Sequence, residues 1–215
     1  MSLTVTGLTV GAFQENCYLL VEAGGSRCAI IDPGAEPERI IAAIEHSGAV
    51  PDAIWLTHAH LDHIGAVSAL RRRWNIPVYL HPLDAPLYAM ASRQAALYGL
   101  PFEQPEPPDR TLGDGDVLEL GALRFTVMHA PGHAPGHAIF HGHGIALVGD
   151  CLFAGSIGRT DLPMSNPRDL AVSLERIVAL PEDTVVYPGH GPVTSIGVEA
   201  ATNPFLNGVA RIVGA

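Results

Sequence analysis

The chain has 215 residues, a length that suits a single domain with a sizeable core, and we expect that domain to span residues 1–215. Hydrophobic residues make up 47% of the sequence and charged residues 16%, which excludes a disordered chain and favours a well-buried α/β protein. Twelve basic residues against 22 acidic ones give a formal net charge of −10, which argues against a nucleic-acid-binding surface.

The cysteines and the N-terminus indicate the compartment. Cys17, Cys28 and Cys151 form no CxxC pair, and their odd number argues against a disulfide framework. The N-terminus lacks a basic stretch followed by an apolar core, and no apolar run approaches the ~18 residues of a membrane span. We therefore expect a cytoplasmic protein that contacts neither a membrane nor nucleic acid.

Alternating residues and short apolar runs predict a β-α-β rhythm in the first half of the chain. In chain order we expect strands over 3–10, 16–22 and 27–31, a helix over 36–48, a strand over 53–56, a helix over 62–74, a strand over 78–80 and a helix over 82–99. Gly24-Gly25 predicts a hairpin turn between two of these strands. We interpret Asp32-Pro33-Gly34 as a turn that closes the third strand, without a further role.

The second half opens with a stretch over 100–110 that contains four prolines and several acidic residues. It predicts an irregular loop, which could be a lid, a pocket wall or a plain connection. Beyond it we expect strands over 117–120, 124–129, 137–141 and 144–149, a helix over 167–180, a strand over 184–187 and a short helix in the tail over 195–215. Pro167 stands at the first position of its helix, where proline is favoured.

The stretch Thr57-His58-Ala59-His60-Leu61-Asp62-His63 places three imidazoles and a carboxylate within six residues. It follows the predicted strand over 53–56 and leads into the helix, which we expect Asp62 to cap. His58 and His60, two apart in extended backbone, would project to the same side. Neutral imidazole and carboxylate are ligands of zinc and other borderline divalent ions, so we predict a metal site rather than a chance cluster.

Further candidate ligands follow other predicted strands. His133 comes after the strand that ends near 128, Asp150 after the strand over 144–149, and His190 after the strand over 184–187. Because loops at a common edge of a sheet can converge on one point, these side chains can join the histidine cluster. His129 and His137 flank the loop of His133, and we expect structural roles for them.

HxHxDH at 58–63, followed by His133, Asp150 and His190, resembles the ligand pattern of the metallo-β-lactamase superfamily, and the likeness extends from Phe13-Gln14-Glu15-Asn16-Cys17 to Asn203-Pro204-Phe205-Leu206. The resemblance implies an α/β fold, the αββα sandwich, in which two mixed β-sheets are flanked by helices and metals lie at the sheet edge. It also implies how the ligands divide between two metals: His58, His60 and His133 for the first, Asp62, His63 and His190 for the second, and Asp150 as a bridge.

The segment over 155–163, GSIGRTDLP, together with YPGHGP over 187–192, is similar to the short glyoxalase II-like, or hydroxyacylglutathione hydrolase-like, subfamily. That resemblance implies a dinuclear metallohydrolase that cleaves a small thioester such as S-lactoylglutathione by a metal-bridging hydroxide. Its cofactors would be two divalent metal ions, zinc first, with iron or manganese as alternatives. Asp62 would orient the hydroxide or accept a proton. Arg159 would bind a substrate carboxylate or, as an equal alternative, pair with Asp161.

Two other functions remain open at this point. A similar Gly-Arg-Thr-Asp occurs in persulfide dioxygenases, which implies as an alternative a mononuclear iron enzyme acting on glutathione persulfide through His58, His133 and Asp150. A catalytically idle metal-binding domain is the third possibility. The complete ligand pattern argues against it, because an idle domain has no need of those side chains.

Overall fold

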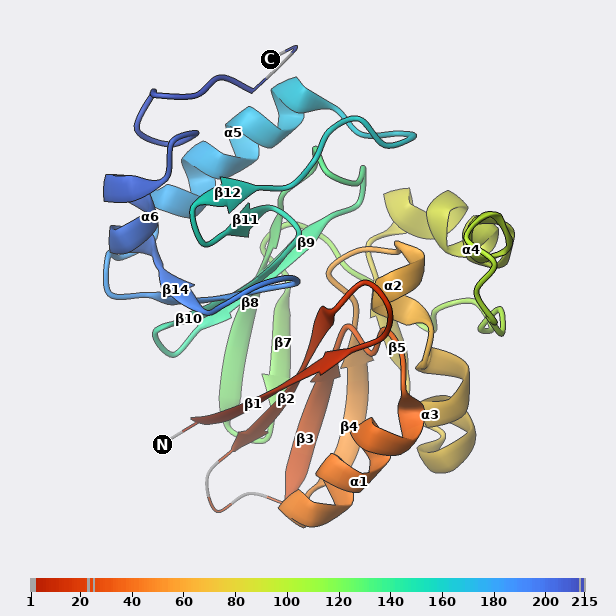
Figure 1. Cartoon of the computed structure of the whole chain (residues 1–215). Helices are drawn as coiled ribbons and strands as arrows, with labels where there is room; N and C mark the ends of the chain where they lie inside the picture. Colours follow the sequence, from red (N-terminus) through yellow and green to blue (C-terminus); the bar gives the residue numbers. More distant parts are fainter. Residues whose placement is uncertain (1–2, 23, 25, 213, 215) are drawn as a thin grey trace.

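Two six-stranded β-sheets lie face to face in the computed structural model, and helices cover their outer faces (Figure 1). The structure describes residues 3–22, 24, 26–212 and 214. Each sheet contains both parallel and antiparallel neighbours, so both sheets are mixed. The predicted α/β fold with αββα layers is confirmed.

The strands of the first sheet follow the order of the chain: β1 (Leu3–Val10), β2 (Glu15–Glu22), β3 (Arg27–Ile31), β4 (Val50–Trp55), β5 (Val78–Leu80) and β6 (Arg110–Thr111). The second sheet has the order β14 (Thr194–Ser195), β13 (Val185–Pro188), β10 (Ile145–Gly149), β9 (Ala138–Gly142), β8 (Leu123–His129) and β7 (Val117–Leu120). A separate small hairpin consists of β11 (Leu152–Phe153) and β12 (Ser156–Ile157). The sequence did not predict β6, β11, β12 or β14, because two residues show no periodicity. The predicted Gly24-Gly25 turn lies partly outside the described residues, which do not include Gly25.

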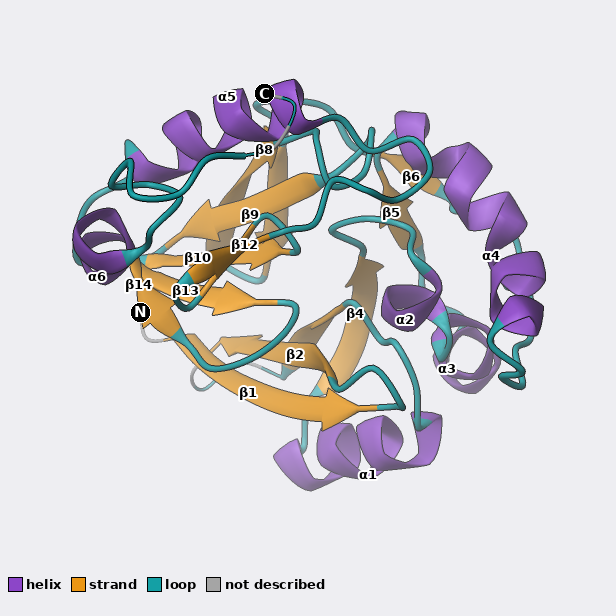
Figure 2. Ribbon diagram, turned by 45° about the horizontal axis from the view of Figure 1, so that its top comes forward, coloured by secondary structure: helices purple, strands orange, loops and turns teal. Residues whose placement is uncertain are grey.

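Helices divide between the two outer faces (Figure 2). On the first sheet lie α1 (Pro37–Ser47), α2 (Leu61–Ile64), α3 (Val67–Trp74) and α4 (Ala85–Leu97), the last preceded by the 3₁₀ turn η1 (Pro82–Asp84). On the second sheet lie α5 (Pro167–Val178) and α6 (Ile196–Thr202). Among the described helices, none combines the length and the apolar character that a membrane crossing needs.

Side chains of β2 alternate between two cores. Tyr18 and Leu20 belong to the core between the sheets, whereas Cys17 and Leu19 belong to the core beneath the helices. Because both faces of the strand are covered, all four residues are buried. This double burial explains why the sequence shows apolar runs rather than a regular polar alternation.

Trp55 anchors the last residue of β4 in the core between the sheets. Its ring lies 5.7 Å from those of Phe125 and Phe140, and all three side chains are fully buried. The contact with Phe125 is edge-on, a geometry that stabilises a pair of rings beyond their buried area. The histidine stretch begins two residues later, so it starts from a rigid strand end.

The helix predicted over 62–74 is interrupted, because α2 ends at Ile64 and α3 begins at Val67. The Ala66 N–H donates to Pro33 O at 2.9 Å instead of continuing the helical ladder. A side chain at Gly65 would also collide with Gly34 O, since a Cβ there would lie 2.3 Å away. The turn over 33–34 therefore replaces one helical hydrogen bond and fixes α2 in place.

The expectation that Asp62 caps the helix is wrong. His60 occupies the N-cap position in extended backbone, and Asp62 is the second residue of α2. Its carboxylate is therefore not used for capping a helix. It lies 3.4 Å from His190 Nε2 instead, among the candidate ligands.

The Pro-rich loop is fastened to the neighbouring helices over its second half. Arg71 of α3 donates to the carbonyl oxygens of Glu106 at 3.2 Å and Pro107 at 3.1 Å, and it pairs with Asp109 at 3.0 Å. Tyr88 of α4 donates its hydroxyl to Glu106 O at 3.0 Å. These contacts make residues 106–109 a tethered connection.

Candidate metal centre

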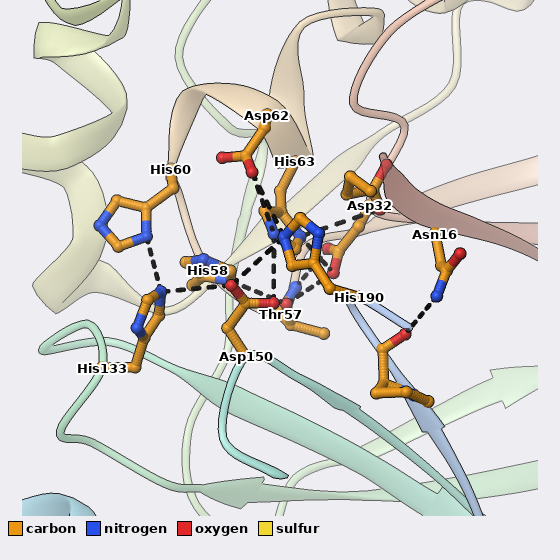
Figure 3. Close-up of polar contacts among 12 residues, drawn as sticks. Asn16, Asp32, Thr57, His58, His60, Asp62, His63, His133, Asp150 and His190 are labelled. Carbon is orange, nitrogen blue, oxygen red and sulfur yellow. Dashed lines mark hydrogen bonds and ion pairs between the residues drawn. The ribbon is translucent and has the colours of Figure 1, made fainter. Parts of the chain in front are cut away.

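The predicted ligands lie at one edge of the sandwich, where strands end. β4, β10 and β13 run into the segments that contain His58, Asp150 and His190, and the loop after β8 contains His133. β10 and β13 are parallel, and β8 points the same way because two antiparallel pairings separate it from β10. Carboxyl ends of strands therefore deliver the side chains to a common point (Figure 3).

The predicted ligands form two groups of donor atoms that a metal ion could bridge. His58, His60 and His133 make up one group, with His60 Nδ1 2.9 Å from His133 Nε2. The other group contains His63, Asp62 and His190. Here Asp62 Oδ2 lies 3.4 Å from His190 Nε2 and 4.0 Å from His63 Nε2.

Asp150 lies between the two groups. Its Oδ1 is 3.4 Å from His63 Nε2, and its Oδ2 is 3.5 Å from both His133 Nε2 and His190 Nε2. One carboxylate thus reaches ligands of both groups. The structure brings all seven predicted ligands together around it.

Unpaired buried atoms test whether the donors fit metal ions. Among the described residues, five buried side-chain atoms have no hydrogen-bond partner: both carboxylate oxygens of Glu15, and His58 Nε2, His63 Nε2 and Asp150 Oδ1. An unsatisfied buried polar atom costs about 1–3 kcal/mol, and native structures contain few. Here three such atoms belong to predicted ligands, and metal coordination would satisfy all of them. The donor set therefore fits divalent metal ions.

In three of the five proposed histidine ligands, a hydrogen bond to Nδ1 leaves Nε2 as the nitrogen that can bind metal. His63 Nδ1 lies 3.1 Å from Asp32 Oδ2, and His133 Nδ1 lies 2.9 Å from Arg159 O. His58 Nδ1 lies 3.0 Å from Thr57 Oγ1. In each ring Nε2 remains for a metal, which is the usual way in which outer partners orient a ligating histidine.

Asp32 has a role that the sequence analysis did not assign. Its Oδ1 accepts the Thr57 N–H at 2.7 Å, and its Oδ2 accepts the Thr57 hydroxyl at 2.6 Å besides contacting His63. Asp32, His58 and His63 also lie close enough to form a donor group of their own. We assign Asp32 to orienting His63 instead, because both of its oxygens already have partners. An acidic residue at the end of β3, the parallel neighbour of β4, is the sequence signal that could have identified it.

Asp84 is a second residue that the sequence analysis missed. It is fully buried in η1, where Oδ2 accepts the Ala59 N–H at 2.9 Å and Oδ1 accepts the Gly136 N–H at 2.5 Å. Burial raises the pKa of Asp84 to about 6. A single carboxylate thus ties the His58–His60 segment to the loop of His133. No pattern in the sequence indicates this link.

Residues of β2 hold the loop that contains His190. Asn16 donates its side-chain amide to Pro188 O at 3.2 Å and to Gly191 O at 2.8 Å, and its backbone N–H to Gly189 O at 2.7 Å. The Tyr18 hydroxyl donates to Pro188 O at 2.7 Å. β2 therefore positions His190 from the opposite sheet.

Gly149 and His137 fix the backbone of Asp150 in place. Gly149 has φ +47°, and a Cβ there would lie 2.4 Å from Thr57 Oγ1 and 2.7 Å from His137 Nε2. His137 Nε2 accepts the Asp150 N–H at 3.0 Å, and its ring stacks on His58 with centroids 4.9 Å apart. Only glycine allows β10 to end this close to the histidines. His137 thus supports the centre.

The directions of the pKa shifts indicate neutral histidines in the first donor group and a protonated histidine in the second. Burial lowers the pKa of His58 and, with the adjacent His133, brings the pKa of His60 to about 3. Burial alone would lower the pKa of His63, but the Asp150 carboxylate raises it. Burial alone would raise the pKa of Asp150, but His63 holds it below its usual range. A metal ion would take over the positive charge that protonated His63 supplies, so binding would release protons.

A cavity of about 450 Å³, the metal cavity, opens over this centre. Its floor includes His60, Asp62, His133, Asp150 and His190, and most of its wall is apolar. The wall residues come from the β1–β2 turn, the end of α4, the small hairpin and the segment after it: Phe13, Leu97, Tyr98, Phe153, Ile157 and Leu162. This arrangement places a few polar groups within a mostly apolar lining, as is common in ligand pockets.

Arg159, the predicted substrate-binding residue, lines this cavity. Its Nε and Nη2 donate to the two carboxylate oxygens of Asp161 at 2.6 and 2.7 Å, and both side chains are exposed. The ion pair with Asp161, which the sequence predicts as one of two alternatives, is therefore present. Arg159 O also accepts from His133, so this segment supports the centre through its backbone.

Seven histidine and aspartate donors at the edge of an αββα sandwich are an arrangement typical of the metal sites of metallo-hydrolases. A family profile described as metallo-beta-lactamase superfamily matches residues 10–190, and the chain belongs to this superfamily. The family predicted from the sequence is thereby confirmed.

Three relatives illustrate the similarity. The chain is 42% identical over 207 residues to the probable metallo-hydrolase YqgX of Bacillus subtilis, covering 94% of this chain and 96% of the relative. It is 39% identical over 205 residues to the hydroxyacylglutathione hydrolase GloC of Haemophilus influenzae, covering 93% and 96%. The crystal structure of TTHA1623 in a di-iron-bound form superposes with a TM-score of 0.87 at 47% identity, covering 94% of this chain and 100% of that one.

Proposed function

We propose that the protein is a dinuclear metallohydrolase of the glyoxalase II type, which cleaves a small thioester such as S-lactoylglutathione. The observation that carries this proposal is the complete set of seven donors, in two groups that share Asp150, at the floor of an apolar cavity. Similarity to the hydroxyacylglutathione hydrolase GloC supports the choice of substrate class.

Two divalent ions in these groups would lower the pKa of water and polarise the carbonyl of a substrate. Zinc is our first choice, and iron and manganese are alternatives, because imidazole and carboxylate donors suit all three. The di-iron form of TTHA1623 is a reason to keep iron among the candidates.

Asp62 is the residue that we propose to move a proton. Although burial opposes it, a hydrogen bond from His190 lowers the pKa of Asp62, so the carboxylate is ionised at neutral pH. It lines the metal cavity, and Oδ2 faces His190. During hydrolysis the carbonyl carbon gains a bond to the oxygen of water and loses its bond to sulfur. Asp62 accepts the proton of that water, and the thiolate leaves as an anion.

Arg159 is the residue that we propose to bind a substrate carboxylate at the mouth of the cavity. Its guanidinium is exposed and already oriented by Asp161. A planar guanidinium can offer two parallel hydrogen bonds to a carboxylate, which glutathione carries. The apolar wall opposite would cover the acyl group and keep bulk water away from the thioester.

A mononuclear iron dioxygenase acting on glutathione persulfide is the second candidate. His58, His133 and Asp150 could hold a single ion, since His133 Nε2 lies 3.5 Å from Asp150 Oδ2. The second donor group favours the hydrolase, because Asp62, His63 and His190 also lie within ligating distance of one another.

Metal content and activity, measured on one sample, decide between the two candidates. Protein purified without chelator is subjected to elemental analysis and then assayed with S-D-lactoylglutathione while oxygen is monitored. Two metals per chain with thioester cleavage and no oxygen uptake would support the hydrolase. One iron, no cleavage, and oxygen consumption with glutathione persulfide would overturn it in favour of the dioxygenase.

Matched histidine variants add a control. His190→Ala is expected to lose one metal and thioester cleavage, because it removes a donor of the second group. His46→Ala removes an exposed histidine of α1 and is expected to keep both metals and full activity. Equal activity of the two variants would contradict a role for the second group.

A further inference from the structure

A second cavity of about 310 Å³ lies beside the metal cavity, and we call it the side cavity. Four segments supply its wall: the end of β1 and the β1–β2 turn with Ala12, the turn after β3 with Gly34, α2 with Leu61, and the chain beyond α4 with Leu100 and Phe102. The function proposed above does not use this space.

The two cavities share a boundary. Phe13, Leu61 and Asp62 line both of them, and Asp62 is a proposed metal ligand. The chain leaving α4 also runs along both, with Tyr98 in the metal cavity and Leu100 in the side cavity. The side cavity is therefore adjacent to the place where substrate would react.

An aromatic pair stands at this boundary. The ring of Phe13 packs edge-on against Tyr98, with centroids 5.4 Å apart. Phe13 is 38% exposed and Tyr98 60% exposed, so few contacts hold either ring. Rotation of weakly held side chains of this kind takes nanoseconds or less, which would let a substituent pass between the cavities.

The lining of the side cavity suits an uncharged ligand. Val10, Phe13, Leu61, Leu100 and Phe102 provide hydrocarbon surface. Apart from Asp62, its charged side chain is Glu36, which pairs with Arg39 and accepts the Gly11 N–H at 3.1 Å. Within the part of the chain that the structure describes, no arginine lines this cavity. An anionic group buried there would therefore find no cationic side chain in the lining to pair with.

We infer that the side cavity is a subsite for an uncharged hydrocarbon group of the substrate, attached either to the acyl carbon or to the sulfur of the thioester. This inference rests on the proposed thioesterase function and deepens it. A cavity of ~150 Å³ is enough for benzene, so about 310 Å³ accepts a ring or a short alkyl chain.

Chain-length series test the subsite. One hydrolysis series varies the acyl group, with S-acetyl-, S-butyryl- and S-hexanoylglutathione. The other varies the thiol, with S-ethyl, S-butyl and S-hexyl thioacetate. We expect kcat/KM to rise about fourfold per methylene group in one series, because burying one methylene group contributes ~0.8 kcal/mol. The series that shows the rise identifies which side of the thioester enters the cavity.

A filling variant links the effect to this cavity. Ala12 is exposed and lines the side cavity, so Ala12→Trp is expected to fill it and abolish the dependence on chain length. Ala122→Trp is the matched control, because Ala122 is exposed in the β7–β8 turn and lines neither cavity. The control should keep the wild-type dependence on chain length.

Binding of thioethers separates this inference from the proposed function. Calorimetric titration with S-methyl- and S-hexylglutathione needs no hydrolysis. Tighter binding of the hexyl compound to wild type, lost in Ala12→Trp but kept in Ala122→Trp, would support the subsite even if no thioester were cleaved. Cleavage without any dependence of rate or affinity on chain length would overturn the subsite and leave the hydrolase standing. The subsite is also overturned if Ala12→Trp keeps the wild-type dependence.

Discussion

The floor of the metal centre and the mouth of its cavity differ in how firmly their side chains are held. Beneath the floor, the buried Asp32 accepts one backbone N–H and the buried Asp84 accepts two, all from the segments that contain the proposed ligands. At the mouth, Leu97 is 86% exposed and Tyr98 60% exposed. The floor is thus fixed by buried hydrogen bonds, whereas the mouth consists of exposed side chains that are mostly apolar, with Arg159 among them.

This difference suits the two parts of the site to different functions: the floor to metal binding and the mouth to substrate selection. Ligand geometry must hold to a fraction of an ångström for metal chemistry, and buried hydrogen-bonded partners provide that precision. Substrate contacts can vary without disturbing the fold, because exposed side chains contribute little to stability. Changes on the floor should therefore alter metal content, and changes at the mouth should alter substrate preference alone.

The largest effect is expected for Asp150→Asn, which changes the carboxylate that both donor groups share. Loss of charge and of one acceptor should lower the affinity for both metals by more than the ~10–100-fold that an outer partner contributes. Elemental analysis should then find clearly fewer than two metals per chain. Asp183→Asn changes an exposed aspartate near the start of β13 and should leave the count unchanged. Full metal content in Asp150→Asn would contradict the bridging role.

Asp84→Asn should have the next largest effect, although the hydrogen bonds of Asp84 go to backbone groups and not to the side chains of the proposed ligands. An amide nitrogen would face either the Ala59 or the Gly136 N–H, donor against donor, and leave a buried group unsatisfied. We expect metal affinity to fall about 10–100-fold, as measured by competition with a chelator. Asp52→Asn, in an exposed pair with Arg27, is the control and should bind metal as the wild type does. Wild-type affinity in Asp84→Asn would show that the two ligand loops hold without this link.

A smaller and more selective effect is expected for Asn16→Ala. The variant loses the side-chain hydrogen bonds to Pro188 O and Gly191 O but keeps the backbone bond to Gly189 O. Only the group with His190 should weaken, by about tenfold, so metal titration should show one site at wild-type affinity and one weaker site. Asn207→Ala, at an exposed position in the tail, should leave both sites intact. Equal weakening of both sites would contradict the assignment of Asn16 to the His190 loop.

The fold was predictable where periodicity is strong. Most strands and the helices α1, α4 and α5 match the expected ranges, because their apolar residues repeat over several turns or strand residues. The break between α2 and α3 was not predictable, since it depends on the Ala66 N–H meeting Pro33 O from a distant turn. Local spacing still favours one continuous helix there.

The candidate site was predictable to a similar degree. All seven proposed ligands stand in a spacing that the superfamily shares, and the structure places them together, while their binding of metal stays a prediction. Asp84 and Asn16 could not be assigned from sequence, because each acts through backbone groups that are 25 to 175 residues away. Asp32 could have been noticed, since it directly follows β3, the strand beside β4.

The smallest effect is expected at the mouth, for Arg159→Ala. Its pair with Asp161 is exposed, and exposed ion pairs stabilise proteins little, so melting temperature and metal content should stay at wild-type values. Arg159 holds the pKa of Asp161 at about 2, and that pKa should rise toward its ordinary value in the variant. If Arg159 also binds a substrate carboxylate, KM for S-lactoylglutathione should rise about two- to fivefold at constant kcat, since uniform binding alone is lost. Arg124→Ala removes a similar exposed pair, with Glu119, that does not line the cavity. If the KM of Arg159→Ala is no higher than that of Arg124→Ala, Arg159 pairs with Asp161 and does not bind the substrate. Substrate selection would then depend on the apolar wall of the cavity.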